Sequence, residues 1–412
     1  MEGLIVVGRD PLEKIIRRVA ANGNCSGCGA CVLVSPRVSM GLDEEGYMRP
    51  RLNSVFPSDG LSSAEESKLF KAICPGVGLA ARAATEMRHH EIFGAFVSSW
   101  QGWASDPDIR FSGSSGGVIT ALAAWLVETG RATSVVGSRG GETDPKRTVT
   151  VSVEDTVGVK SISGSRYAPV SNVELYKADD SRQVFVGKPC EASAAAKLSE
   201  AAGVQDPPIL LSFFCAGTPS QLGTDNLVRL LGHANDVDDV RYRGNGWPGE
   251  FRLSKNGQRV GSMSYDESWG RHIGRQIQWR CKICPDGTGG DADISVGDFW
   301  AADANGYPVF DTAEGNSVVI ARSQRGAVIL REAAAAGIIA LAPVDLDDVA
   351  AIQPLQVERK ITLLGRLVGR IVTLKRVPRY RGFGLAVLST RGIKKSTRAV
   401  VGTARRSVRW MQ

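Results

Sequence analysis

The sequence predicts an α/β fold, of mixed α+β character, between a cysteine-bearing N-terminal region and a basic helical tail. Short apolar runs alternate with helical patterns from about residue 91 to 345, as expected for a sheet that binds ligands at its strand ends. Eight cysteines are spread along the chain, three of them in one short run. From Arg359 onward there are fifteen Lys or Arg and no Asp or Glu. These observations divide the chain into residues 1–90, 91–345 and 346–412.

The elements of the central region follow from hydrophobic periodicity. Strands are expected at 93–100, 134–137, 184–187, 209–214, 294–296 and 317–322, and helices at 118–128, 191–201, 219–231 and 326–336. The Ala-rich stretch 78–90 predicts a further helix in the N-terminal region. The apolar spacing of 361–372 predicts an amphipathic helix in the tail.

Composition places the chain among cytoplasmic globular proteins. At 412 residues with 43% hydrophobic content, it is long enough for two or three domains. No apolar run reaches the roughly 18–20 residues that a membrane span needs, and Glu2 stands where a signal peptide would be positively charged. In a reducing compartment, eight cysteines indicate metal ligation or catalysis rather than disulfides.

The charge distribution is uneven. Because the whole chain carries +7, the residues before Arg359 carry −8. A basic tail of this kind suits an anionic membrane face, nucleic acid or an acidic protein, and the plain alternative is a solvated or disordered end. Nucleic acid is not expected as the partner. Peripheral contact of the tail with the inner membrane face is kept as a hypothesis.

The first cysteine set begins with Cys25-Ser26-Gly27-Cys28-Gly29-Ala30-Cys31. Three thiolates at this spacing, separated by small residues, let a tight loop wrap a [4Fe–4S] cluster. In two-cluster ferredoxins a cysteine before proline follows three residues later, but here that position is Ser35. Cys74, also followed by proline, is the candidate fourth ligand. A structural zinc site is the alternative, although zinc ligands usually occur as two separate pairs.

The other four cysteines form a second candidate set: Cys190, Cys215, Cys281 and Cys284. Cys190 and Cys215 each follow a predicted strand, which places both at the ligand-binding edge of the sheet. Four cysteines suit a second [4Fe–4S] cluster. A four-cysteine zinc site, or a redox-active C-x2-C pair with two buried bystanders, are the alternatives.

Two loops have the composition of a nucleotide site. Ser112-Gly113-Ser114-Ser115-Gly116-Gly117 opens the helix predicted at 118–128, where free N–H groups and the helix dipole suit phosphate. A plain helix cap explains this loop equally well. Gly164-Ser165-Arg166-Tyr167 adds a hydroxyl, a cation and an aromatic ring. Trp247 lies in an unusual turn and serves either ring stacking or packing.

Taken in order, these motifs resemble the coenzyme F-420 hydrogenase/dehydrogenase beta-subunit family. The matching segments span about residues 20–325: CSGCGAC, CPG, SGSSGG, GSRYAP, VGKPC, FFCAG, GNGWPG, CKICPDGTGGDADISVGDFW and GNSVVI. Members include hydrogenase subunits, ferredoxin-dependent reductases of chlorophyll derivatives and proteins of exopolysaccharide gene clusters.

The resemblance implies FAD and two [4Fe–4S] clusters, with coenzyme F-420 as a candidate hydride partner. The residues it implies around FAD are Ser114, Ser115, Gly116, Gly117, Ser165, Arg166 and Tyr167. It places Cys190, Cys215, Cys281 and Cys284 at the inner cluster. Asp293 and Asp298 look typical of the family, in either a structural or a catalytic role.

The expected function is an oxidoreductase that relays electrons between a one-electron donor, such as ferredoxin, and an organic small-molecule acceptor. The cofactors supply the chemistry and the protein supplies position and electrostatics; no side chain is assigned as catalytic. The alternatives are an electron-transfer subunit of a larger redox complex without its own substrate, and a zinc-stabilised binding protein.

Overall fold

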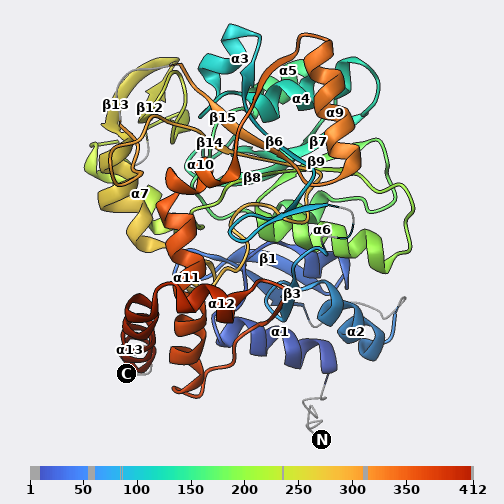
Figure 1. Cartoon of the computed structure of the whole chain (residues 1–412), viewed down its shortest axis with the longest axis vertical. Helices are drawn as coiled ribbons and strands as arrows, with labels where there is room; N and C mark the ends of the chain where they lie inside the picture. The colour runs from blue at the N-terminus through green and yellow to red at the C-terminus, as the bar shows by residue number, and fades with distance from the viewer. Residues whose placement is uncertain are drawn as a thin grey trace, which may run out of the picture.

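The computed structural model describes residues 10–53, 61–83, 85, 87–233, 236–309 and 314–409. At its centre lies an eight-stranded mixed sheet (Figure 1). From edge to edge its strands are β16 (Ile339–Pro343), β6 (Ser98–Ala104), β15 (Ser317–Ala321), β14 (Ile294–Asp298), β10 (Ile209–Phe213), β9 (Gln183–Gly187), β7 (Ser134–Gly140) and β8 (Thr148–Val153). The α/β class predicted from the sequence is confirmed.

Four neighbouring strands of this sheet run parallel. β7 pairs with β9, β9 with β10, and β10 with β14, all in the same direction. In this register Phe213 lies opposite Val296, and Ser212 opposite Gly187. The carboxyl ends of β9, β10 and β14 therefore meet at one edge, where α/β proteins bind their ligands.

Both faces of the parallel strands are buried, which explains their continuous apolar runs. Val135, Val184 and Leu211 point into one core, with helices α4 (Val118–Glu128) and α9 (Gln324–Ala335). Their chain neighbours point the opposite way, as strand geometry requires. That second core includes Phe185 and Leu210 and is covered by α6 (Pro189–Ala201).

The N-terminal region packs against the α6 side of the sheet. It comprises α1 (Pro11–Ala21), the 3-10 turn η1 (Ala30–Leu33), the hairpin β1 (Val38–Leu42) and β2 (Met48–Leu52), α2 (Ser63–Ile73) and β3 (Gly78–Ala80). Leu12, Ile16 and Phe70 share one core with Phe185 and Leu210. The cysteine-bearing region is therefore continuous with the central sheet.

The helix expected at 78–90 is wrong. Residues 78–80 form β3, and β4 (Arg88–His90) pairs with β5 (Gly94–Phe96). β3 lies parallel to β17 (Arg379–Arg381) from the far end of the chain. Pairing with a distant segment here overrides the helix propensity of the alanines.

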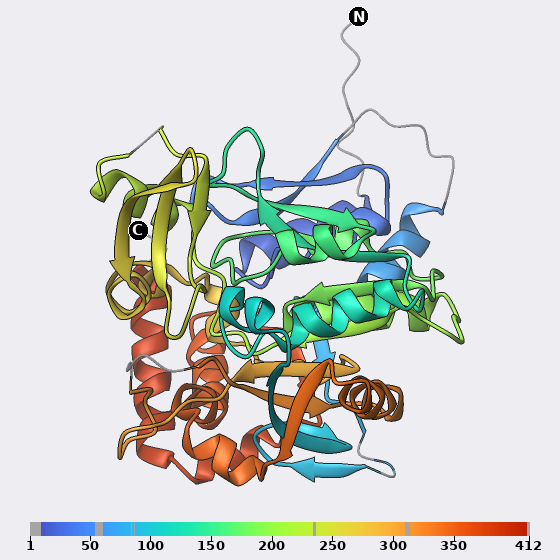
Figure 2. The same cartoon turned by 90° about the horizontal axis from the view of Figure 1, so that it is seen from above.

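A smaller three-stranded sheet, which was not predicted, lies to one side of the central sheet (Figure 2). Its strands are β11 (Asp239–Arg241), β12 (Glu250–Lys255) and β13 (Gln258–Ser264), packed with α7 (Gln221–Leu230). The remaining short elements are α3 (Pro107–Ser112), α5 (Thr156–Ser161), η2 (Asn172–Leu175), the π-helical turn η3 (Asp266–His272), η4 (Ile273–Gln276), α8 (Trp279–Lys282) and α10 (Leu346–Ala351).

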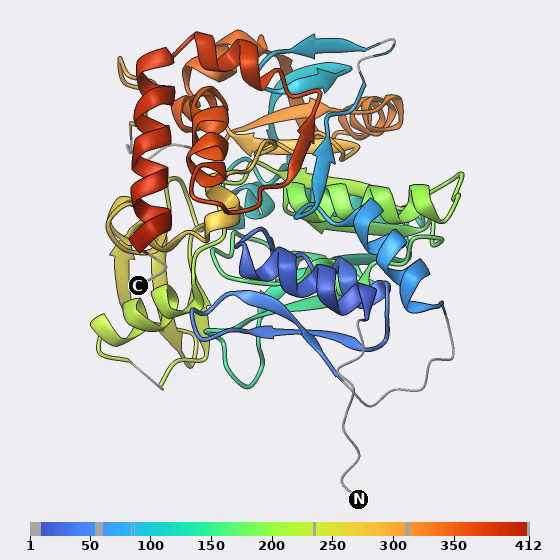
Figure 3. The same cartoon turned by 90° about the horizontal axis from the view of Figure 1, so that it is seen from below.

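The basic tail folds into helices α11 (Pro354–Ile371), α12 (Leu385–Thr390) and α13 (Ile393–Arg409). α11 and α13 lie side by side (Figures 1 and 3). A Cβ added to Gly365 would lie 2.2 Å from the Ser396 carbonyl oxygen, and one added to Gly369 would lie 2.5 Å from that of Val400. These two glycines therefore let the helices approach closely. No helix in the described part of the chain is long and apolar enough to cross a membrane.

We predict that Gly365→Ala lowers the free energy of unfolding by about 1–3 kcal/mol, because the new methyl group must push α13 away. Gly402→Ala, on α13, is the matched control. Its added Cβ would find nothing nearer than the flexible end of the Arg406 side chain at 3.4 Å, so helix propensity should leave stability equal or up to about 1 kcal/mol higher. Urea denaturation of both variants tests the contact, and equal stabilities would contradict it.

Candidate functional site

The first cysteine set is brought together as the spacing predicts. Gly27 and Gly29 have φ of +75° and +88°, which lets the loop fold around its thiols. The pKa of Cys28 is raised to about 11 and that of Cys74 to about 12, chiefly by burial and in part by the nearby Cys25 thiol. The pKa of Cys31 is also raised, first by burial and then by the other three thiols. All four side chains therefore lie close to one another.

Backbone donors point at two of these sulfurs. The N–H of Ala30 stabilises the charged form of Cys28, and those of Gly76 and Val77 stabilise that of Cys74. Such N–H contacts also tune iron–sulfur clusters.

The second cysteine set gathers at the carboxyl edge of the parallel strands. Cys190 lies in the first turn of α6 after β9, and Cys215 follows β10. Burial raises the pKa of Cys215 to about 12, and the thiols of Cys281 and Cys284 add to the rise. The Thr218 N–H donates to the Cys281 sulfur at 3.3 Å. Burial also raises the pKa of Cys190, with lesser contributions from Cys281 and from Cys28 of the first set.

The two sets thus adjoin, and Arg280 lies beside both. Its side chain is buried, and one terminal nitrogen donates to the Pro75 carbonyl, next to Cys74, at 3.1 Å. The thiols of Cys284 and Cys190 act on the same guanidinium. Two of its nitrogens, Nε and Nη1, are buried without a hydrogen-bond partner. Burying a cation without hydrogen-bond partners costs free energy of folding unless an anion lies beside it.

The described Cys, His, Asp and Glu side chains include no group of three that converges as closely as a single metal ion requires.

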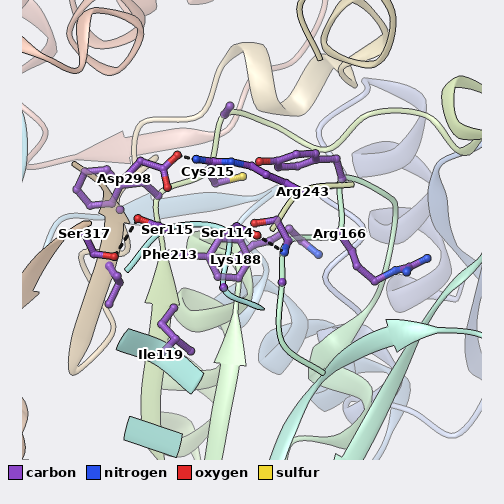
Figure 4. Close-up of a pocket in the computed structure, with 18 of the residues that line it drawn as sticks. Ser114, Ser115, Ile119, Arg166, Lys188, Phe213, Cys215, Arg243, Asp298 and Ser317 are labelled. Atoms are coloured by element: carbon purple, nitrogen blue, oxygen red, sulfur yellow. Dashed lines mark hydrogen bonds and ion pairs between the residues drawn. The ribbon is translucent and has the colours of Figure 1, made fainter. Parts of the chain in front are cut away.

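A cavity of about 720 Å³ opens at the same edge of the sheet (Figure 4). Its wall includes Cys215, so the second cysteine set faces it directly. Of the residues predicted around a flavin, the following line it: Ser114, Ser115, Gly117, Ser165, Arg166 and Tyr167. Gly116 lies behind the wall, where its N–H donates to the Ser317 hydroxyl at 2.9 Å.

The two predicted loops meet in this wall. The Ser165 N–H donates to the Ser114 hydroxyl at 2.7 Å, and Ser115 and Ser317 share a hydrogen bond of 2.9 Å (Figure 4). Gly117, with φ of +73°, precedes α4, and no side chain caps this helix. Its first N–H groups are therefore not satisfied by a cap and suit a phosphate.

Arg166 lines the cavity but is already engaged by the protein. Its guanidinium donates to the Thr148 hydroxyl and to the carbonyls of Val240 and Pro145, each at 2.9 Å. Its charge therefore supports the loops of the wall. The ring of Tyr167 lies 4.7 Å from that of Trp269 and forms part of an aromatic wall.

Sequence reasoning missed the principal cation of the cavity, Arg243. It forms an ion pair of 2.5 Å with Asp298 and lies over the rings of Trp247 and Tyr265, at 4.6 and 4.7 Å. Its Nη2 atom is buried without a partner. Arg243 directly precedes the GNGWPG turn that contains Trp247, but its other partners, Asp298 and Tyr265, come from separate segments of the sequence. Trp247 also stacks on Trp300, with centroids 6.4 Å apart.

The two aspartates of the ADISVGDFW segment differ in place. Asp298 lies in the cavity wall. Asp293 is buried away from it, accepting from the Leu210 N–H at 3.0 Å and pairing with Arg325 at 2.6 Å. It therefore joins β10, β14 and α9.

Comparison with known proteins identifies the family of this chain. Two family models of the coenzyme F420 hydrogenase/dehydrogenase beta subunit match the chain. The model of the N-terminal part matches residues 99–177, and the model of the C-terminal part matches residues 180–347. No curated protein matches the sequence.

Among solved structures, a chain of the F420-reducing [NiFe] hydrogenase complex from Methanosarcina barkeri has a similar fold. The TM-score is 0.53 at 18% identity, and the match covers 71% of this chain and 99% of that chain. At this identity the likeness concerns the fold alone. Because the two family models together cover more than half of the sequence, the chain belongs to the coenzyme F420 hydrogenase/dehydrogenase beta-subunit family, a family of oxidoreductase subunits.

Proposed function

We propose that this chain is an iron–sulfur flavoprotein that relays electrons through two [4Fe–4S] clusters to FAD, and from there to an organic acceptor or a deazaflavin. One observation carries the proposal: the cavity, the second cysteine set and the first cysteine set adjoin in that order. Cys215 belongs to both the cavity wall and the second set. Cys190 and Cys28 link the second set to the first.

The donor sets fit clusters better than zinc. A Zn²⁺ site draws four ligand atoms to one point, whereas a cubane is held by cysteines at separate corners. The three closely spaced cysteines of the first set favour the second case, because zinc ligands usually occur as two separate pairs. Arg280 supports the same assignment, because an anionic cluster beside it would compensate its buried charge.

The cavity fits a flavin dinucleotide in size and lining. Its volume of about 720 Å³ lies in the range of cofactor sites. The uncapped start of α4 suits the pyrophosphate, and the rings of Tyr167, Trp247 and Tyr265 supply flat surfaces for a stacked ring.

The bound cofactors would supply single-electron transfer and its conversion to hydride transfer. The chain's own residues would position and balance these groups. The eight cysteines would hold the clusters as thiolates. Lys188, Arg280 and Arg359 place positive charge near the second set, which favours the thiolate form. The free Nη2 of Arg243 would donate to a bound ring or acceptor.

A second candidate function is an electron-transfer subunit that works only within a larger complex. The similar chain from Methanosarcina barkeri belongs to a multi-component hydrogenase complex. Co-purification of a stable partner from native cells would favour this alternative over a self-sufficient reductase.

We predict about eight irons, eight sulfides and one FAD per chain after anaerobic purification, with absorption that bleaches on reduction by dithionite. Cys28→Ser should lose about four irons and leave the other cluster in place, and Cys215→Ser should do the same for the second set. Metal and sulfide analysis with absorption spectra measures this. Zinc in place of iron would contradict the proposal.

We predict that Ser114→Ala weakens FAD binding about tenfold, because the hydroxyl that accepts from the Ser165 N–H holds the two loops together. The control is Ser161→Ala, which removes an exposed hydroxyl bonded only within α5. Flavin fluorescence titration of the deflavinated proteins gives the dissociation constants. An unchanged constant in Ser114→Ala would argue against FAD at this wall.

A further inference from the structure

The C-terminal segment contacts the loops that carry both cysteine sets. Arg376 bonds the first set's loop in two ways: its N–H donates to the Asn22 side chain at 2.8 Å, and its carbonyl accepts from Asn24 at 3.0 Å. β17 then pairs with β3, a few residues after Cys74. On the other side, Arg366 donates to the Lys282 carbonyl, between Cys281 and Cys284, at 2.8 Å. The surface that covers both sets is therefore built from the basic tail.

This surface carries an exposed apolar tip. Ile371, Val372 and Leu374 are exposed, and Leu374 is 94% exposed. Leu374 also has φ of +59°, a conformation that a leucine adopts only at a cost. Neither packing nor backbone geometry favours an apolar side chain at this position, so the tip is suited to contact with another molecule.

Cations crowd around the tip. The last turn of α13 lies against the end of α11, where Arg370 contacts Ser407. Arg405 and Arg406 are exposed in this last turn of α13, and Arg376 is exposed just after the tip. The charge of Arg406 also acts on Arg366, so these cations repel one another. No ion pair within the described residues compensates these cations. Such repulsion lowers stability and is relieved by an anionic partner.

We propose that this docking face (Ile371, Val372, Leu374, Arg376, Arg405 and Arg406) receives an acidic one-electron carrier protein that reduces the first cluster. The proposal rests on the proposed function for the cluster itself. A small apolar centre surrounded by cations fits a transient redox complex, in which charge steers association. Figure 3 shows α1, α11 and α13 together on this side of the molecule.

The position of the first set explains why electrons would arrive here. Cys25 is half-buried, and its neighbour Asn24 is hydrogen-bonded to Arg376. Each encounter would oxidise the carrier by one electron and reduce the cluster by one. Two encounters would supply the electron pair of one hydride, and water would supply its proton.

The test uses the cofactor-loaded protein and a plant-type ferredoxin, a small acidic carrier, in stopped-flow reduction. Arg376→Ser/Arg405→Ser should lower the second-order rate constant about tenfold at low ionic strength, and added salt should shrink the difference. The control, Arg229→Ser/Arg331→Ser, removes two exposed arginines on α7 and α9 and should leave the rate unchanged. Equal rates in the two double variants would overturn the proposal.

Leu374→Asn tests the apolar tip without unfolding the chain. Asparagine tolerates a positive φ better than leucine, so the free energy of unfolding should be equal or higher while reduction by ferredoxin slows several-fold. An undiminished rate would overturn the role of the tip.

Two further measurements distinguish failure of the docking proposal from failure of the proposed function. Calorimetry with oxidised ferredoxin measures docking without electron transfer. Equal affinity in the wild type and the variants would overturn the proposal. Reduction by dithionite tests whether the cofactors accept electrons without a protein donor. Failure of this reduction would instead overturn the proposed function. If the variants lose affinity for phosphatidylserine vesicles but keep the ferredoxin rate, the face binds membranes and the proposal is wrong.

Discussion

The site depends on one constraint: charge-bearing groups are buried between the sheet edge, the N-terminal region and the C-terminal helices. Arg280 is enclosed with unpartnered nitrogens next to thiols of the second set and to the Pro75 carbonyl, which follows Cys74 of the first set. Burial alone favours neutral thiols, since it raises the pKa values of Cys28 and Cys74 well above the ordinary range. Iron binding would require thiolates. The arginine therefore favours the charged state that the buried surroundings oppose.

The parallel strands explain why chemistry gathers at one edge. Cys190, Cys215 and Asp298 lie at or just after the ends of β9, β10 and β14. Register alone brings these three residues together, although more than a hundred residues separate the first from the last. The smaller sheet and its neighbouring loops close the cavity by adding Arg243, Trp247 and Tyr265.

The sequence was informative where local pattern determines structure. The helix at 118–128 is confirmed as α4, and the strands near 184–187 and 209–214 are confirmed as β9 and β10. The loops at 112–117 and 164–167 meet as neighbours in the cavity wall. Periodicity and the residues that open helices are short-range signals, and they could be recognised without the fold.

What could not be predicted depends on distant contacts. Residues 78–80 form a strand because β17 pairs with them from three hundred residues away. Arg243 acquires its role only when Asp298 and Tyr265 reach it from other segments. Arg166 looked like a free cation, but the carbonyls of Pro145 and Val240 occupy its donors. The hydroxyl, cation and ring of residues 164–167 are equally compatible with contacts to a ligand and with hydrogen bonds that stabilise neighbouring loops.

The basic tail shows both local and distant effects. Its helix could be predicted from the sequence, but its position against the cysteine sets could not. The apolar spacing predicted a helix near 361–372, and α11 contains most of it. Its buried Leu363 and Leu367 pack against Ile283, between Cys281 and Cys284, so the amphipathic face covers the second cysteine set. The sequence alone left the arginines of the tail open between contact with an anionic surface and a solvated end, and the fold places Arg366 and Arg376 beside the two cysteine sets. Because cluster binding and folding are coupled in such sites, the same helices that would close the second cluster also shape the surface above the first.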